Sequence, residues 1–187
     1  MTNDERYLLA SLKDDPPSAP PDDWDRLLRL AVRHGACAHV HQHLDGRAPA
    51  GVAAELRTRA RAAAVRSLAL TAELLRLMES FESAGVAVLP FKGPVLAALV
   101  DGEKALRDYG DIDLLVRPSD AARAFELLTG LGYEAPDGVE PWFFACGRQR
   151  PLVKKGGGMA VDVHWSLMPA SFAGEAGEEP VWDRRGS

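Results

Sequence analysis

The segment GDIDLLV at residues 110–116 carries the clearest strand pattern of the sequence, together with two acidic residues. Side chains two apart on a strand point to the same face, so Asp111 and Asp113 project together while Ile112 faces the opposite way into packing. The apolar residues that follow Asp113 are typical of a strand. We therefore expect a β-strand over 111–116 that carries two carboxylates on one face.

Two carboxylates held this close repel one another, so one of them has its pKa raised unless a cation lies between them. Mg²⁺ takes one or two carboxylates from a protein when phosphates and water fill its other positions. The pair Asp111 and Asp113 is therefore a candidate divalent-metal site, although a DxD at a strand end also occurs as an ordinary turn cap.

A second strand, MAVDVHWSL at residues 159–167, carries Asp162 between two valines. An unpaired charge among apolar residues is costly, which favours a role for this carboxylate. If this strand lies beside the first, three carboxylates converge and can hold two metals about 3.5–4 Å apart, one for the attacking oxygen and one for the leaving phosphate. His164 shares the face of Asp162 and is a further candidate.

The remaining pattern predicts helices, then strand, helix, strand, helix and a hairpin. Helices are expected over 4–13, from Asp22 or Asp23 to Gly35, and, as a third helix, from there to near Gly46. Further helices are expected from Pro49 to about Ala84, over 94–101, and over 119–132 with Ser119 as the cap. A strand is expected over 86–91, and Gly156 to Gly158 join the strands RPLVKK and MAVDVHWSL into a hairpin. This order indicates an α+β or α/β domain behind a helical N-terminal part.

Composition narrows the class of protein. The chain has 47% hydrophobic and 26% charged residues and a formal net charge of -5, which argues against a protein that mainly grips nucleic acid. Cys37 and Cys146 form no disulfide framework or zinc knuckle. No basic signal region or membrane span is evident, so we expect a cytoplasmic protein.

Three segments together resemble a known family: FKGPVLAAL at 91–99, LRDYGDIDLLV at 106–116 and VDVHW at 161–165. Over about residues 68–168, the chain is similar to the uncharacterised nucleotidyltransferase family of the DNA polymerase β-like superfamily. The resemblance implies an α+β fold with a nucleotidyltransferase-like mixed β-sheet and flanking helices. It divides the chain into a helical region at 1–66, a catalytic domain at 67–169 and an irregular tail at 170–187.

The same resemblance implies that Asp111 and Asp113 bind Mg²⁺ or Mn²⁺, that Asp162 completes the site, and that the turn at Lys92 and Gly93 cradles a nucleoside triphosphate. Superfamily members usually have Gly-Ser in this turn, whereas here Pro94 follows Gly93. Lys92 can supply a charge for the phosphate instead. The long spacer leaves Arg107 within reach of phosphate, and the chain stops sooner than relatives that continue into further helices.

Two other groups of residues are considered as functional sites. The three histidines of AHVHQHL, His39, His41 and His43, lack the glutamate of a zinc-protease helix and are interpreted as a solvated helix face. The arginines at 57, 59, 61 and 66 are interpreted as an exposed face of the long helix.

The leading interpretation is an enzyme that transfers a nucleotidyl group from a nucleoside triphosphate to an unidentified acceptor (a small molecule, peptide or protein) and releases pyrophosphate. Two alternatives stay open. One is a glycosyltransferase that uses a DxD with a sugar nucleotide. The other is an inactive binding or regulatory module that kept the fold.

Overall fold

The computed structural model of the 187-residue chain describes residues 1–13, 15, 19–44, 46–93, 109–136, 148–166 and 182. These residues divide into two compact units, of which the first contains Met1–Thr71 and Tyr109 and the second contains Ala72–Gly93 and the described residues from Gly110 onward. The expected helix over 94–101 and, apart from Trp182, the expected irregular tail lie outside the described residues.

The first unit is helical, as predicted. It contains α1 (Asn3–Leu12), α2 (Trp24–Arg33), α3 (Cys37–Gln42) and the first part of α4 (Ala50–Ser83). Asp23 caps α2 by accepting hydrogen bonds from the backbone N–H groups of Asp25 and Arg26, which confirms one of the two caps considered. The third helix ends at Gln42, several residues before the expected end near Gly46.

The core of this unit is formed by the apolar faces of the four helices. It contains Tyr7, Leu8, Leu27, Ala31, Ala36, Cys37, Val40, Val52 and Leu56. His39 is also buried, with 7% of its surface exposed, so the expectation of a solvated histidine face is wrong for this residue. The reason is that α3 packs against both α1 and α2, so that Cys37, His39 and Val40 of this helix are all buried.

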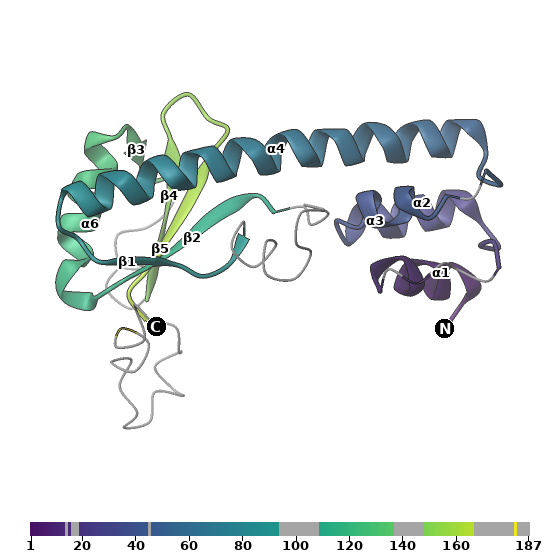
Figure 1. The fold of residues 1–187 in the computed structure, drawn as a ribbon, viewed down its shortest axis with the longest axis horizontal. Coiled ribbons are helices and arrows are strands. Elements are labelled where there is room, and N and C mark those ends of the chain that lie inside the picture. The colour runs from purple at the N-terminus through teal and green to yellow at the C-terminus, as the bar shows by residue number, and fades with distance from the viewer. Residues whose placement is uncertain are drawn as a thin grey trace, which may run out of the picture. The chain divides into compact units, whose positions relative to one another are not determined.

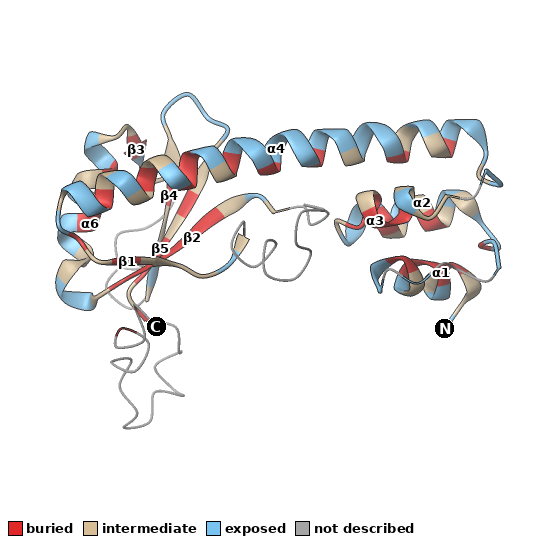
Figure 2. Cartoon of the chain, viewed as in Figure 1, coloured by how far each residue is buried: buried red, intermediate tan, exposed pale blue. Residues whose placement is uncertain are grey.

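The long helix α4 follows its predicted apolar periodicity over Ala50–Ser83. Its buried residues form a stripe, visible in Figure 2 as red positions along one side of the ribbon, because apolar side chains three and four apart share a helix face. The helix ends where predicted, since Gly85 takes the positive φ of 64° that L residues disfavour. The arginines at 57, 59, 61 and 66 are exposed, as expected.

The second unit is built on one five-stranded mixed sheet (Figure 1). Its strands are β1 (Val88–Pro90), β2 (Asp111–Val116), β3 (Tyr133–Glu134), β4 (Gln149–Lys154) and β5 (Ala160–His164), in the order β1-β2-β5-β4-β3. Only β2 and β5 are parallel, and the other neighbours are antiparallel. The strand over 111–116 is therefore confirmed. The predicted hairpin of RPLVKK (150–155) and MAVDVHWSL (159–167) is also confirmed, although β5 ends at His164, and β1 is shorter than the expected strand over 86–91.

Helices cover one face of the sheet. On this face, Lys154 of β4 donates a hydrogen bond to Glu73 of α4 over 2.8 Å, and the rings of Phe125 in α6 and Trp165 after β5 meet edge to face at 5.8 Å. Helices α4 and α6 (Ala121–Gly130) therefore cover this face. Buried Ile112, Leu114, Val161 and Val163 belong to it by the alternation along β2 and β5.

The expected capping of α6 by Ser119 is wrong. Residues Pro118–Asp120 form a 3₁₀ turn ahead of the helix, and Asp120, which makes no side-chain capping hydrogen bond, occupies the N-cap position. Proline fixes its own φ near the helical value, so Pro118 starts a helical turn before Ser119 can act as a cap.

Candidate metal centre

The parallel pairing of β2 with β5 brings the acidic residues to one face of the sheet. In the register of these strands Asp113 lies opposite Asp162, Asp111 lies opposite Ala160, and Leu115 lies opposite His164. Residues that are paired in a sheet, or that lie two apart on one strand, point to the same side. Asp111, Asp113, Asp162 and His164 therefore share the face opposite to the one that α4 and α6 cover, and the expected neighbourhood of the two strands is confirmed.

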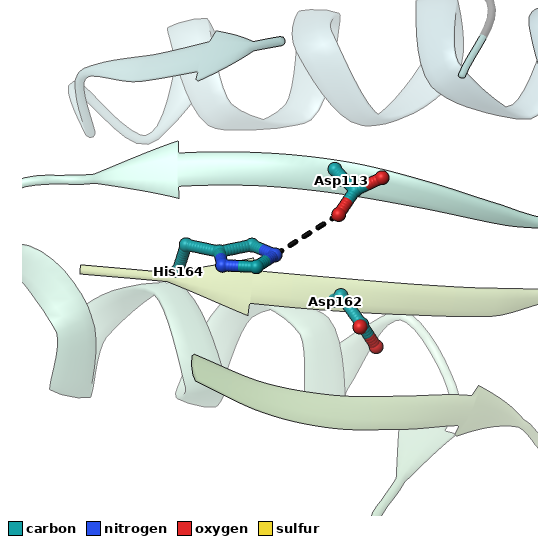
Figure 3. Close-up of side chains that lie close together, drawn as sticks. All are labelled: Asp113, Asp162 and His164. Carbon is teal, nitrogen blue, oxygen red and sulfur yellow. Dashed lines mark hydrogen bonds and ion pairs between the residues drawn. The ribbon is translucent and has the colours of Figure 1, made fainter. Parts of the chain in front are cut away.

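Three of these side chains form a compact group. The nearest ligand atoms of Asp113, Asp162 and His164 all lie within 4.8 Å of one another, and Figure 3 shows Asp113 on one strand facing the other two residues on the next. Asp113 and His164 are buried, and Asp162 is half-buried. Asp111 lies on the same face, at the first position of β2, but outside this group.

Asp113 is held by two nitrogen-bearing side chains. The ammonium of Lys92 donates a hydrogen bond to Asp113 Oδ1 over 2.8 Å, and Nε2 of His164 lies 3.0 Å from the same oxygen. Burial acts to raise the pKa of Asp113, but the hydrogen bonds from His164 and Lys92 outweigh it and the pKa is lowered. Asp113 is therefore ionised at neutral pH, although its side chain is buried on the face of the sheet.

Asp162 has the opposite electrostatic environment. Burial raises its pKa above the usual value, and the negative charges of Asp111 and Asp113 raise it further. An ionised Asp162 is thus disfavoured by its neighbours, and a divalent cation among these carboxylates would relieve the repulsion. The donor atoms fit such an ion, because carboxylate oxygens are the protein ligands that Mg²⁺ and Mn²⁺ accept.

Lys92 and Gly93 lie two and three residues after Pro90, the last residue of β1. Lys92 is exposed over 53% of its side chain, and Gly93 has a positive φ of 52°, which fits a change of chain direction after the strand. The structure thus places Lys92 beside Asp113, a contact that the sequence did not predict. Arg107 and Pro94, which were considered for the phosphate, lie outside the described residues.

Phe91 was not predicted to belong to the site. Its ring meets the imidazole of His164 edge to face, with 4.9 Å between the ring centroids, and its backbone N–H approaches Asp113 O at 3.4 Å. In the sequence, Phe91 is the last residue of the apolar run VAVLPF. Its contact with His164 of β5 could not be predicted, because that contact depends on the order of the strands. Among the described residues, the histidines of α3 form no group of three metal ligands.

The second unit has a nucleotidyltransferase-like α+β fold. Its five-stranded mixed sheet carries helices on one face and the converging acidic group on the other. The chain belongs to the family described as uncharacterised nucleotidyltransferases, whose model matches residues 20–187. A search of curated proteins found no match to the chain. No helix among the described residues is long and apolar enough to cross a membrane.

Proposed function

We propose that the protein is a metal-dependent enzyme that moves a nucleotidyl group from a nucleoside triphosphate to an acceptor and releases pyrophosphate. The observation that carries the proposal is the direct pairing of Asp113 with Asp162 across the parallel strands. It supports a site in which carboxylates from two strands act on the same ion. Family membership over residues 20–187 supports the same class of reaction.

In this proposal Asp111, Asp113 and Asp162 hold Mg²⁺ or Mn²⁺. When bound, such an ion neutralises phosphate charge and activates the attacking oxygen. The positive charge of a bound ion would offset the repulsion by Asp111 and Asp113 that, together with burial, raises the pKa of Asp162. Asp111 is proposed to complete the coordination, and its position two residues before Asp113 on the same face of β2 supports this.

Lys92 has a second role in the proposal. Its ammonium pairs with Asp113 Oδ1 over 2.8 Å, and its side chain is 53% exposed. The long flexible stem of lysine would allow the same ammonium to contact a phosphate oxygen of the substrate when Asp113 serves as a metal ligand. Gly93 leaves room for the triphosphate at the turn, and Arg107 is proposed as a further phosphate contact. The catalytic domain is proposed to be residues 67–169.

The acceptor is proposed to be a small molecule, a peptide or a protein. The formal net charge of -5 disfavours a nucleic acid, because binding to its phosphates depends on clustered positive charge.

The decisive experiment supplies triphosphates labelled at the α-phosphate or at the γ-phosphate, with Mg²⁺ or Mn²⁺ and cell extract as the source of acceptor. The proposal predicts transfer of the α-label, release of pyrophosphate, and loss of both in Asp162→Asn. Transfer of the γ-label would indicate phosphoryl transfer instead. Hydrolysis of sugar nucleotides without pyrophosphate release would favour a glycosyltransferase, and metal binding without turnover would favour a binding module.

A further inference from the structure

His164 lies where a nitrogen ligand to the metal would be expected. Its Nε2 lies 3.0 Å from Asp113 Oδ1, a ring nitrogen of the same imidazole groups within 4.8 Å with ligand atoms of Asp113 and Asp162, and only 6% of the residue is exposed. The edge-to-face contact with Phe91 limits rotation of the imidazole, so the direction of Nε2 is fixed by packing on one side and by β5 on the other.

The distance between the two nearest donors fits a shared ion. His164 Nε2 and Asp113 Oδ1 are 3.0 Å apart. Two adjacent ligands of an octahedral ion, each about 2.1 Å from the metal and about 90° apart, are separated by about 3 Å. The pair therefore already has the spacing of neighbouring positions in one coordination sphere, in strands whose backbones are fixed by the β2–β5 register.

A mixed nitrogen and oxygen donor set distinguishes among cations. Mg²⁺ prefers oxygen ligands and keeps much of its water, whereas imidazole suits first-row transition metals. Mn²⁺ is the transition-metal ion that also accepts carboxylates readily in octahedral geometry. A site with one imidazole and two or three carboxylates should therefore bind Mn²⁺ more tightly than a site of carboxylates alone, relative to Mg²⁺.

We propose that His164 is a metal ligand through Nε2 and that it makes the centre prefer Mn²⁺ to Mg²⁺. The proposal rests on the metal site of the proposed function, but not on the identity of the reaction. In this role Nε2 would present its lone pair to the ion, and the proton of the imidazole would lie on Nδ1. The competing role is a positioning residue that keeps its proton on Nε2 and only orients Asp113.

Electron spin echo spectroscopy of the Mn²⁺-loaded full chain separates these roles, because a directly bound ¹⁴N couples strongly to the Mn²⁺ spin. The wild type is expected to show this nitrogen modulation, His164→Gln to lose it, and His41→Gln, a matched substitution in α3, to keep it. Calorimetry with Mn²⁺ and Mg²⁺ alone is expected to show that His164→Gln lowers the ratio of Mn²⁺ to Mg²⁺ affinity by roughly tenfold, the lower range for loss of a group that supports a metal.

A second measurement covers the case in which His164→Gln does not fold. Wild-type protein labelled with ¹⁵N-histidine should replace the ¹⁴N modulation by the ¹⁵N pattern. Mn²⁺ binding without strong nitrogen coupling, or an unchanged affinity ratio in folded His164→Gln, overturns the proposal and leaves His164 as a positioning residue. Failure of Mn²⁺ to bind at all overturns the metal site of the proposed function as well. Strong histidine coupling without nucleotidyl transfer upholds the ligand and rejects only the reaction.

Discussion

Replacing Glu73 with Gln is expected to lower the free energy of unfolding by about 2–3 kcal/mol at neutral pH. Glu73 lies on α4 and is buried, with 7% of its surface exposed. Its carboxylate accepts hydrogen bonds from Arg76 Nε at 3.0 Å and Nη2 at 2.6 Å, from Lys154 Nζ at 2.8 Å and from Tyr133 Oη at 2.6 Å. This network ties α4 to β3 and β4 on the covered face of the sheet.

The magnitude follows from the pKa of Glu73. The hydrogen bond from Arg76 lowers this pKa most, burial opposes it, and the bonds from Lys154 and Tyr133 lower it further, so that it falls from 4.5 to about 2. A pKa that is lower by this much corresponds to roughly 3–4 kcal/mol. The side chains of Arg76 and Lys154 are 41% and 33% exposed, and solvent screening of these cations reduces the figure to about 2–3 kcal/mol.

The assay is denaturant unfolding of the wild type and Glu73→Gln between pH 7 and pH 2.5, with Glu79→Gln at an exposed position of α4 as the control. Because the folded-state pKa of Glu73 is depressed, its contribution is complete above pH 4.5 and is lost as the pH falls toward 2. The variant should lack that part of the pH dependence, and its thermal midpoint should be lower by about 4–12 °C. A loss below about 1 kcal/mol, or an unchanged pH dependence, would refute the reasoning.

Two further perturbations act on the acidic face itself. Burial and the charges of Asp111 and Asp113 raise the pKa of Asp162, so the metal-free protein should lose stability as the pH rises through that pKa. At pH 7, Asp162→Asn should therefore be as stable as the wild type or more stable. The same is expected, to a smaller degree, of Asp111→Asn. Thermal-shift measurements should also find that both variants lose the stabilisation by Mn²⁺ and triphosphate. If the variants instead melt several degrees below the wild type and keep their response to the ligands, these carboxylates are structural. Lys92→Ala should weaken triphosphate binding while raising the affinity for Mn²⁺ alone by about two- to fivefold, since it removes a partly exposed competitor for Asp113. Calorimetry with the metal alone and with metal and triphosphate tests this, and a fall in the affinity for Mn²⁺ alone would mean that Lys92 only positions Asp113.

Local patterns predicted the elements well where a single period applied. The alternation of GDIDLLV predicted β2, the three-and-four spacing from Val52 onward predicted α4, and three consecutive glycines predicted the β4–β5 hairpin. These signals depend on neighbours within one turn or one strand, so the sequence carries them directly. The cap at Ser119 failed because the adjacent Pro118 changed the local backbone, a competition between two short-range signals.

The site depended on contacts that local patterns cannot determine. The strand alternation placed Asp111 with Asp113 and Asp162 with His164 in two pairs, but only the parallel register of β2 with β5 sets Asp113 opposite Asp162. Strand order and register are non-local, and a shift of one residue would turn Asp162 to the other face. The approach of Lys92 to Asp113 depends further on a side-chain conformation, which no sequence period encodes.

The most direct test of the metal site is calorimetric titration of the full chain with a non-hydrolysable nucleoside triphosphate, in Mn²⁺ and in EDTA, for the wild type and Asp162→Asn. We predict saturable binding in the wild type that requires the metal, and a loss of at least about tenfold in affinity in the variant, whose thermal midpoint without metal is unchanged or higher. Equal affinity in EDTA, or wild-type affinity in Asp162→Asn, would contradict the assignment of these carboxylates to a metal that serves the triphosphate.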